Sequence, residues 1–403
     1  MATIVQKYGG TSVGDTGRIQ NVARRICATH EAGNQVVAVV SAMGDSTDEL
    51  LRMAHEISTS PPERELDMLL STGERVSVAL LAMAIHELGH EAISLSGSQA
   101  GIQTDTVHTK ARITGIAGTR LRDTLDSGKI ALVAGFQGMS PDEDVTTLGR
   151  GGSDTTAVAL AAALGADVCE IYTDVDGVYT ADPNIVPQAR KIDIVSYGEM
   201  LEMAATGAEV LMLRSVEYSQ KYSVPLHVRS SFTDKPGTLV RKEDEEMEKA
   251  VVSAVTHTTE ESKLTLLRVP DKPGIAANVF GALAEENVNV DMILQNVSEQ
   301  GTTDISFTVM QADLPAAQRA LDRICDKLGV AYVLGEKMGK VSIVGAGMKS
   351  YPGVAARMFK TLAEQGINIE MISTSSIKVS CVIERDRVAD AVKALHQEFQ
   401  LGG

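Results

Sequence analysis

The chain has 403 residues, enough for two or three domains, and 44% of them are hydrophobic, which is ample for sizeable cores. Its formal net charge of −16 excludes general binding to nucleic acids or anionic membranes, because such binding requires a basic face. Aromatic residues make up only 3% and Trp is absent, which predicts aliphatic cores and disfavours a platform for base stacking.

The cysteines and the N-terminus indicate the compartment. No two cysteines have the spacing of a zinc site or a disulfide framework, so we expect reduced core thiols at Cys27, Cys169, Cys325 and Cys381. The first residues lack a basic region followed by an apolar stretch, so no signal peptide is predicted. The most apolar segment, residues 155–169, is too short and too rich in Ala to span a bilayer. We expect a soluble cytoplasmic protein.

Short β-branched runs alternate with long amphipathic stretches over about the first 240 residues. The run at 35–41, QVVAVVS, is nearly all apolar, as is typical of a strand buried on both faces. This alternation predicts an α/β sandwich with a mainly parallel central sheet. The expected strands are 3–6, 35–41, 92–96, 130–135 and 168–173, and the expected helices are 18–31, 63–88, 155–164 and 197–206.

The last third of the chain contains an internal repeat. Residues 273–293 and 352–372 are identical at 11 of 21 positions when they are aligned at an offset of 79 residues. Each copy follows a strand, and its helix, two strands and second helix predict a β-α-β-β-α-β unit of the ferredoxin-like type. The predicted domains are a catalytic domain at 1–245, a linker at 246–263, and the two repeats at 264–336 and 340–403.

Paired glycines follow the first predicted strand in the motif Lys7-Tyr8-Gly9-Gly10-Thr11. Glycines let the backbone approach a ligand, and successive amides can surround phosphate oxygens, although an ordinary turn would have the same composition. The motif is not a P-loop, because Asp15 stands where the P-loop lysine is required.

A second glycine-rich motif, Gly149-Arg150-Gly151-Gly152-Ser153-Asp154, opens the Ala-rich helix. Ser153 or Asp154 is the expected N-cap, and the preceding glycines and arginine indicate an anion-binding helix N-terminus. A dinucleotide fingerprint is disfavoured because Asp154 occupies the position of its third glycine.

Two further motifs resemble metal sites but lack what those sites need. The loop from Asp174 has the first residues of a calcium-binding EF-hand loop, but its twelfth position is Ile185 rather than a carboxylate. This loop is either a turn-rich connection or the lining of a nucleotide pocket. The motif from His86 to His90 matches H-E-x-x-H, but Gly89 is expected to end the helix before His90 and no third ligand is evident.

These motifs, in this order, resemble the aspartate kinases of the amino-acid kinase superfamily, and the two repeats resemble paired ACT domains. The motifs are KYGGTSV at 7, VSAMGDSTDEL at 40, TGERVS at 72, GRGGSDTTA at 149 and YTDVDGVYTADP at 172. The resemblance covers nearly the whole chain and is greatest to the monofunctional, lysine-sensitive form of Gram-positive bacteria. It implies an amino-acid-kinase sandwich followed by two ACT domains, and phosphorylation of the side-chain carboxylate of L-aspartate by ATP with Mg²⁺. That reaction is the first step of lysine, threonine and methionine biosynthesis.

The resemblance also assigns roles to individual residues. Lys7 is expected to neutralise phosphate charge, and Asp154 to hold Lys7 or Mg²⁺ in place. Glu74 is expected to bind the substrate ammonium, and Arg150 to bind its α-carboxylate, with Ser153 beside it. The other implied substrate-binding residues are Ser41, Thr47, Gly151 and Gly152, and the implied ATP-binding residues are Lys7, Tyr8, Gly9, Gly10, Thr173, Asp174, Tyr179 and Asp182. The family commonly has Arg after the Asp-Pro pair where this chain has Asn184, which puts one nucleotide contact in doubt.

In the ACT repeats the resemblance implies pockets for lysine, threonine or both as effectors. For Asp271, Asp291 and Gln295 a ligand role is the better explanation, because an amino-acid effector presents an ammonium group that needs acceptors. For the hydrophobic candidates a core role is the better explanation. The full set is Asp271, Gly274, Ile275, Ala276, Asn289, Asp291, Gln295 and Ser298 in the first repeat, and Gly353, Val354, Asn368, Ile369 and Ser375 in the second.

The resemblance further implies a homodimer formed through the ACT domains. In close relatives a shorter subunit starts inside the same gene, and Met247 stands at the corresponding place. Two alternatives stay open: a kinase for glutamate, N-acetylglutamate or UMP, and a non-catalytic amino-acid sensor. A fusion to homoserine dehydrogenase is not expected, because the residues after the second repeat are too few for a dinucleotide domain.

Overall fold

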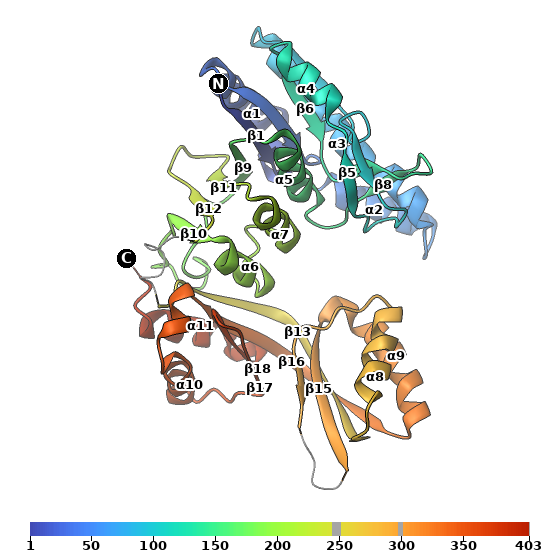
Figure 1. Cartoon of the computed structure of the whole chain (residues 1–403), viewed down its shortest axis with the longest axis vertical. Helices are drawn as coiled ribbons and strands as arrows, with labels where there is room; N and C mark the ends of the chain where they lie inside the picture. The colour runs from blue at the N-terminus through green and yellow to red at the C-terminus, as the bar shows by residue number, and fades with distance from the viewer. Residues whose placement is uncertain (244–250, 297–300, 403) are drawn as a thin grey trace. The chain divides into compact units, whose positions relative to one another are not determined.

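The computed structural model describes residues 1–243, 251–296 and 301–402, which form two compact units (Figure 1). The first unit contains residues 1–178, 191–204 and the described residues from 209 to 243. The second unit contains residues 179–190, 205–208 and the described residues from 251 onward. Two short segments that lie within the first 245 residues of the sequence therefore pack with the repeats.

An eight-stranded sheet forms the centre of the first unit, in the order β10-β12-β11-β9-β1-β2-β6-β3. Every neighbouring pair is parallel except β11 with β12, which confirms the predicted, mainly parallel sheet. Its strands are β1 (Thr3–Tyr8), β2 (Gln35–Val40), β3 (Ala92–Leu95), β6 (Ile130–Ala134), β9 (Val168–Thr173), β10 (Ile194–Ser196), β11 (Leu226–Ser230) and β12 (Thr238–Arg241).

A second, four-stranded sheet in the same unit was not predicted. Its order is β5-β4-β7-β8, and its strands are three or four residues long. Such short strands carry too few apolar residues to show a period of two in the sequence. They are β4 (Ile102–Thr104), β5 (Ile113–Ile116), β7 (Gln137–Met139) and β8 (Val145–Thr147).

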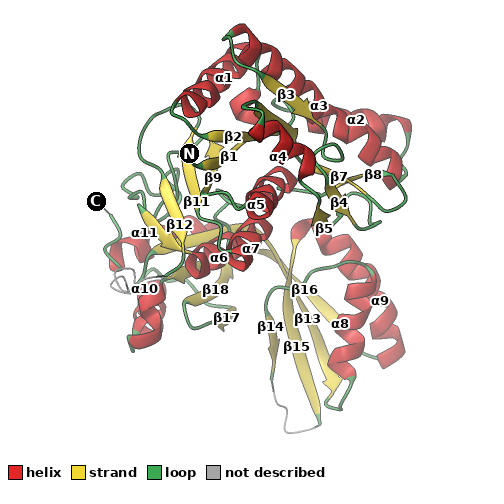
Figure 2. Cartoon of the chain, turned by 45° about the horizontal axis from the view of Figure 1, so that its top comes forward, coloured by secondary structure: helices red, strands yellow, loops and turns green. Residues whose placement is uncertain are grey.

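Helices cover both faces of the large sheet (Figure 2). Residues of α1 and α3 share a buried cluster with Tyr8 and with Val36, Ala38 and Val40 of β2. Successive strand residues point to opposite faces, so Lys7 lies on the other face, where α5 packs against β1, β2 and β9. The helices of the unit are α1 (Thr16–Glu31), α2 (Ser46–Ile57), α3 (Glu63–Glu87), α4 (Thr119–Asp126), α5 (Gly152–Leu164), α6 (Tyr197–Ala205) and α7 (Leu213–Tyr222), with a 3-10 helix, η1, at Gly10–Val13.

Helix α3 is long and apolar enough to cross a membrane by length and composition, and it is the one such helix in the described part of the chain. In the structure it is a core helix, because Val78, Leu81 and Ile85 are buried against the sheet together with α1. The prediction that Gly89 follows the helix end is confirmed: α3 ends at Glu87, and Gly89 has a φ of 86°.

The second unit contains a six-stranded antiparallel sheet in the order β14-β15-β13-β16-β18-β17. Helices α8 and α9 pack on the part that belongs to the first repeat, and α10 and α11 on the part that belongs to the second. The strands are β13 (Ala254–Pro270), β14 (Ile293–Gln295), β15 (Thr302–Met310), β16 (Ala331–Val344), β17 (Met371–Thr374) and β18 (Lys378–Glu384). The helices are α8 (Ile275–Glu285), α9 (Leu314–Leu328), α10 (Val354–Glu364) and α11 (Val388–Glu398), with 3-10 turns η3 (Gln311–Asp313), η4 (Ala346–Ser350) and η5 (Arg385–Arg387).

The first repeat has the predicted β-α-β-β-α-β order, from β13 to β16. The second repeat differs in one strand, since no strand follows α11 in the described residues. Residues 254–258 of β13 pair instead with Lys340–Val344 of β16, so the fourth strand is supplied from upstream of the first repeat. The interval 246–263, predicted as a linker, thus overlaps β13 from Ala254 onward.

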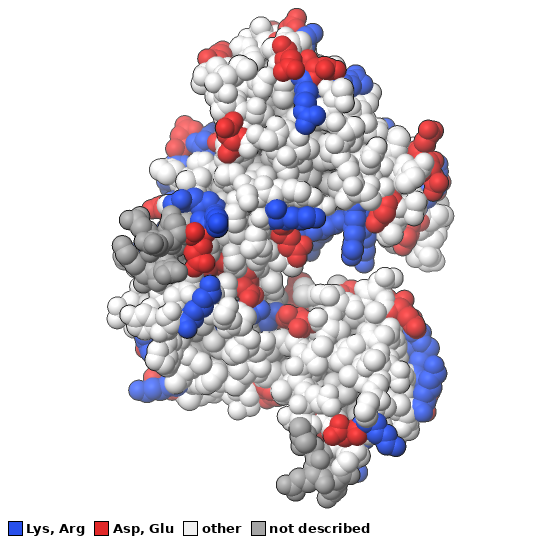
Figure 3. Space-filling view, in the orientation of Figure 1, with Lys and Arg blue, Asp and Glu red and all other residues white. Residues whose placement is uncertain are grey.

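The surface and the cysteines agree with the composition. On the face shown in Figure 3, acidic and basic side chains of the described residues are interspersed. All four cysteines are buried free thiols, as predicted.

Candidate active site

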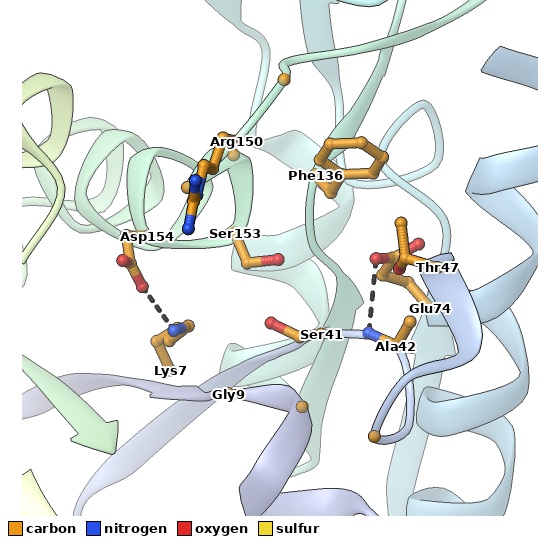
Figure 4. Close-up of a pocket in the computed structure, with 15 residues that line it drawn as sticks. Lys7, Gly9, Ser41, Ala42, Thr47, Glu74, Phe136, Arg150, Ser153 and Asp154 are labelled. Atoms are coloured by element: carbon orange, nitrogen blue, oxygen red, sulfur yellow. Dashed lines mark hydrogen bonds and ion pairs between the residues drawn. The ribbon is translucent and has the colours of Figure 1, made fainter. Parts of the chain in front are cut away.

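A pocket of about 300 Å³ lies in the first unit, and its lining comes from five places in the chain (Figure 4). They are the end of β1 with the turn after it, the segment after β2 with the start of α2, helix α3, the turn after β6, and the segment before α5 with its first turn. The lining residues are Lys7, Gly9, Gly10, Ser41, Ala42, Gly44, Thr47, Glu74, Phe136, Gly149, Arg150, Gly151, Gly152, Ser153 and Asp154.

The direction of the strands brings these segments together. Strands β1, β2 and β6 are parallel neighbours, so their carboxyl ends meet at one edge of the sheet. The glycine turn at Gly9, the segment from Ser41 and the turn at Phe136 follow these three strands. A crevice outside the carboxyl ends of the strands is where open α/β sheets bind ligands.

Lys7 and Asp154 form an ion pair in which the Nζ to Oδ1 distance is 2.6 Å. Their side chains are 13% and 9% exposed, so both groups are largely removed from bulk water but still border the pocket. The next residue, Tyr8, points to the opposite face, where its ring stacks on Tyr172 at a centroid distance of 4.7 Å. The two stacked rings fix β1 against β9 directly behind the lysine.

The first turn of α5 forms one wall of the pocket, but its N-cap differs from the prediction. The N-cap is Gly151, with φ 72° and ψ 13°, and neither Ser153 nor Asp154 caps the helix. A side chain at Gly151 would be strained at this φ, and its Cβ would lie 2.1 Å from Cγ of Met212. The helix therefore begins one residue before Ser153, which leaves Ser153 and Asp154 in its first turn facing the pocket.

Glu74 is a buried carboxyl group with an unused oxygen. Its side chain is 3% exposed, and Oε1 accepts the N–H of Ala42 at 3.3 Å. Oε2 is buried and has no hydrogen-bond partner among the described residues. Burial raises the pKa of Glu74 to about 7, against the lowering effect of backbone hydrogen bonds. A cation entering the pocket would find an acceptor that the protein leaves unsatisfied.

Arg150 supplies a positive charge to the same pocket. In Figure 4 its guanidinium points toward Lys7 and Asp154, above Ser153. No described residue forms an ion pair with it, whereas the ammonium of Lys7 is already paired with Asp154. The pocket thus presents one carboxylate and one guanidinium without protein partners, as a zwitterionic ligand requires.

The structure brings together most of the predicted catalytic and substrate-binding residues and part of the predicted ATP set. Tyr8 is fully buried in the core, so its side chain does not line the pocket. Thr173 and Asp174 hydrogen-bond to each other at the end of β9, outside the lining, and Tyr179 and Asp182 belong to the second unit. The predicted residues that line the pocket are Lys7, Gly9, Gly10, Ser41, Thr47, Glu74, Arg150, Gly151, Gly152, Ser153 and Asp154.

Four lining residues were not predicted: Ala42, Gly44, Phe136 and Gly149. Ala42, Gly44 and Gly149 lie inside the quoted motifs, so the motifs could have indicated them as pocket residues. Phe136 lies outside every motif. Its φ of 69° is unusual for a residue with a side chain, and no sequence pattern indicates it.

The predicted effector residues lie in the second unit, except Ser298, which lies outside the described residues. Gly274 and Gly353 are the left-handed N-caps of α8 and α10, so both Pro-Gly turns start a helix. Val354 is buried in the core of the second repeat, and Ile275 and Ile369 pack against the two repeat cores, which is the core role expected of hydrophobic candidates. Ala276 is exposed and does not have that role. Exposed candidates are Asp271, Ala276, Asn289, Asp291, Gln295, Asn368 and Ser375; Asp291 forms an ion pair with Lys340, and Asn368 donates to Glu370.

The histidines and Asp176 of the two metal-like motifs contact other protein groups in the structure. His86 Nε2 contacts the carbonyl of Ala92, and His90 Nε2 contacts Glu31, so the two imidazoles serve different partners. Asp176 accepts hydrogen bonds from Thr233 and Lys235. Over the described ranges, no group of three or more His, Cys, Asp or Glu side chains is placed to hold a metal ion.

Family models match nearly the whole chain. A model described as the amino acid kinase family matches residues 2–230, and models described as the ACT domain match residues 263–326 and 341–399. The aspartokinase of Mycolicibacterium smegmatis is 58% identical over 409 residues, which cover 100% of this chain and 97% of that protein. The aspartokinase of Corynebacterium efficiens is 56% identical over the same length and coverage.

Solved structures agree with these matches. The crystal structure of aspartate kinase from Synechocystis is 46% identical, with a TM-score of 0.56, over 99% of this chain and 69% of that one. The structure of Escherichia coli aspartokinase III in complex with aspartate and ADP is 26% identical, with a TM-score of 0.85, over 98% of this chain and 99% of that one.

Proposed function

The chain belongs to the aspartokinases of the amino acid kinase family, and from that premise we propose how its pocket phosphorylates the side-chain carboxylate of L-aspartate with ATP. The products are 4-phospho-L-aspartate and ADP. A carboxylate with a pKa of about 4 is already ionised at neutral pH, so the nucleophile needs no general base. Catalysis then depends on positioning the two substrates and on neutralising charge on the transferring phosphoryl group.

The observation that carries the proposal is the pairing of opposite charges across the pocket. The buried, unpartnered oxygen of Glu74 accepts the ammonium of aspartate. The guanidinium of Arg150 binds the α-carboxylate through a bidentate pair, with Ser153 beside it. With both ends of the amino acid held, the side-chain carboxylate is directed toward Ser41 and Thr47, which line the remaining wall.

Phosphoryl transfer is assisted by the positive charge at the end of β1. The ammonium of Lys7 attracts the γ-phosphate oxygens, and its ion pair with Asp154 fixes its position before ATP arrives. Gly9 and Gly10 leave the backbone open beside these oxygens. Of the two carboxylates in the lining, Glu74 is assigned to the substrate ammonium, so Asp154 would hold the Mg²⁺ of Mg-ATP, which would neutralise phosphate charge. The nucleotide roles of Tyr8, Thr173, Asp174, Tyr179 and Asp182 stay predictions.

The regulatory and assembly predictions belong to the same proposal. E. coli aspartokinase III has also been crystallised in complex with lysine and aspartate, at 26% identity and a TM-score of 0.75. On that basis and on the two ACT matches, we propose that lysine, threonine or both bind the second unit and inhibit the kinase, and that a cytoplasmic homodimer forms through the ACT domains. The internal start at Met247 lies outside the described residues and stays a prediction.

Trapping the acyl phosphate with hydroxylamine tests the reaction directly. The chain is incubated with Mg-ATP, hydroxylamine and either L-aspartate or L-glutamate, with and without lysine, threonine or both. We expect hydroxamate from aspartate alone, and its loss on adding effector. No hydroxamate from any carboxylate, in protein that still binds ATP or lysine, would overturn the kinase and leave the amino-acid sensor.

A further inference from the structure

Asp67 is a fully buried carboxylate that does not line the pocket. It lies on α3, seven residues before Glu74, and its side chain is 0% exposed. Residues seven apart on a helix lie on the same side, about 10 Å apart along the axis. The helix that carries Glu74 into the pocket therefore carries a second acid two turns away.

The partners of Asp67 come from two segments that are distant from α3 in the sequence. Oδ2 accepts from His108 Nδ1 at 2.7 Å, and both carboxylate oxygens accept the N–H of Thr109 at 3.1 Å. Oδ1 also accepts the hydroxyl of Thr147 at 2.5 Å. Thr147 is the last residue of β8, three residues before Arg150. Asp67 thus bonds the segment just before the glycine-rich motif to α3, the helix that bears Glu74.

Arg214 forms hydrogen bonds to the same two segments. Its Nη1 donates to the carbonyl of Leu148, and its Nη2 to the carbonyl of Ala111, each at 2.9 Å. The backbone N–H of Ala111 also donates to the carbonyl of Thr147 at 2.9 Å. Thr147 is therefore bonded through both its hydroxyl and its carbonyl, and Leu148 through its carbonyl.

The two segments also touch at Gly149. This residue has a φ of 75°, and a Cβ added to it would lie 3.0 Å from the carbonyl oxygen of Thr109. Thr109 itself has a φ of 62°, which is uncommon for a residue with a branched Cβ. Two hydrogen bonds from its N–H to Asp67 support this conformation. The backbone just before Arg150 is thus set by contacts that end at Asp67 and Arg214.

We propose that Asp67 and Arg214 are positioning residues that fix the distance between Arg150 and Glu74, and so set the fit of the pocket to an amino acid with an α-carboxylate. This inference rests on the proposed role of Arg150. Helix α3 acts as the common support: Glu74 points from it into the pocket, and Asp67 holds the Arg150 segment to it. Neither Asp67 nor Arg214 lines the pocket, so both act through Arg150 and Glu74. Because those two residues are assigned to aspartate, the effect should appear in the affinity for aspartate rather than for ATP.

A double-mutant cycle with purified full-length chain tests the proposal, using the hydroxamate assay with varied aspartate and varied ATP. D67N keeps the side-chain shape but weakens every bond to the carboxylate. We expect the KM for aspartate to rise about tenfold in D67N, because a misplacement of about 1 Å can cost up to 10²-fold. The KM for ATP should stay within about twofold. In R150Q the further change D67N should have almost no effect on the aspartate KM, because coupled residues are not additive.

E199Q is the matched control, since Glu199 is another buried carboxylate of this unit that accepts from a backbone N–H and a hydroxyl, at Ser196, outside the pocket lining. E199Q should leave the aspartate KM unchanged, even if it lowers the stability of the folded chain. If D67N does not fold, R214K is used, since it keeps the charge but loses the two-pronged bond to the carbonyls of Leu148 and Ala111. Independent, multiplicative effects of D67N and R150Q, or an unchanged aspartate KM in folded D67N and R214K, would overturn the proposal. An unchanged aspartate KM in R150Q alone would remove the role of Arg150 while leaving the kinase reaction intact.

Discussion

Each unit of this molecule contains a lysine paired with carboxylates on a sheet, and the two lysines differ in access to a cavity. Lys7 ends β1 and pairs with Asp154 at the edge of the pocket, with 13% of its side chain exposed. Lys340 lies within β16 with 3% of its side chain exposed, and it pairs with Glu261 at 2.7 Å and with Asp291. The first pair faces a space that a ligand can fill, whereas Glu261 and Lys340 are closed in by protein.

Enclosure of Lys340 with two acids changes the pKa of the lysine. Burial by itself would lower the pKa of Lys340, but Glu261 and Asp291 outweigh it and raise the pKa above its ordinary value. The lysine therefore stays charged, and its role is to satisfy two acids rather than to meet a substrate. A buried lysine and acid indicate function only where a pocket reaches them, so mutation of the two lysines should give opposite results.

The largest effect is expected at Lys7. In Lys7→Met the kcat should fall about 10³-fold, because removal of one preorganised donor to a developing charge typically costs about 10²–10³-fold. The free energy of unfolding should fall by less than in Lys340→Met, because Asp154 borders the pocket and water can reach it once the lysine is removed. Initial rates of hydroxamate formation at saturating aspartate and ATP measure this.

Lys7→Arg provides the control, since it keeps the charge but changes its geometry. Partial activity in Lys7→Arg with none in Lys7→Met would show that charge at this position is needed. Full activity in Lys7→Met would contradict the proposed catalytic role and make the two lysines equivalent.

Lys340→Met should give the reverse pattern. We expect the second unit to lose about 3 kcal/mol of unfolding free energy, because breaking a buried ion pair leaves an uncompensated charge at Glu261. Without effector, kcat should stay within about twofold of the parent, because the residue lies outside the pocket lining. Urea unfolding monitored by circular dichroism, beside the hydroxamate assay, separates stability from activity.

The double variant Lys340→Met/Glu261→Leu sharpens this result. Replacing both buried charges by apolar groups of similar size is often neutral or stabilising, so stability should recover. If the double variant is less stable than Lys340→Met alone, Glu261 has a favourable interaction other than with this lysine.

Glu74 differs from both lysine pairs, because it is a buried acid in the pocket that has no lysine partner. Because burial raises its pKa to about 7, the free enzyme is partly protonated at neutral pH and binds the aspartate ammonium less well below that pH. We expect kcat/KM for aspartate to rise with pH through a limb near 7, since this parameter reports the ionisations of the free enzyme. The raised pKa has the opposite effect on folding, because the neutral acid is easier to bury. Its contribution to stability is present at low pH and is lost as the pH rises toward 7.

Glu74→Gln removes the titrating group and tests the assignment. The limb near pH 7 should disappear, and the KM for aspartate should rise about tenfold through loss of one charged hydrogen bond. Persistence of the limb in Glu74→Gln would assign it to another group in the enzyme or the substrate.

Continuous apolar runs made most of the fold predictable. The buried strands β2 and β9 and the helices α1 and α3 were predicted to within two residues at either end. The first half of β13 was missed, because every residue from Thr256 to Lys263 is polar or charged, so no apolar pattern marks the strand. Cross-strand pairing with β16 holds it instead. Residues 179–190 lie within the predicted catalytic domain and pack with the second unit. Their place depends on Ala181 and Val186 packing into the core of the second repeat, a contact between residues distant in sequence.

The pocket was predictable where a motif supplied both its charged groups and its glycines. Lys7, Glu74, Arg150 and Asp154 were named from the motifs, and all four line one pocket. The support around them could not be predicted, since Asp67 and Arg214 lie outside every motif and meet the Arg150 segment only through the tertiary fold. The N-cap was wrong because a left-handed glycine, rather than a side-chain acceptor, starts α5.

The smallest effect is expected at a buried polar contact without a formal charge. Thr180 and His396 are 0% and 1% exposed, and the Thr180 hydroxyl lies 3.0 Å from His396 Nε2 while it donates to the carbonyl of Leu401. Burial lowers the pKa of His396, so the neutral ring stabilises the second unit above the ordinary histidine pKa, and this stability is lost as the pH falls below it. Thr180→Val should cost about 1 kcal/mol, or about 2–4 °C in Tm at pH 7.5. In the parent chain Tm should fall between pH 7 and pH 5.5 by more than in His396→Gln, and equal slopes in the two proteins would show that this histidine is not the titrating group.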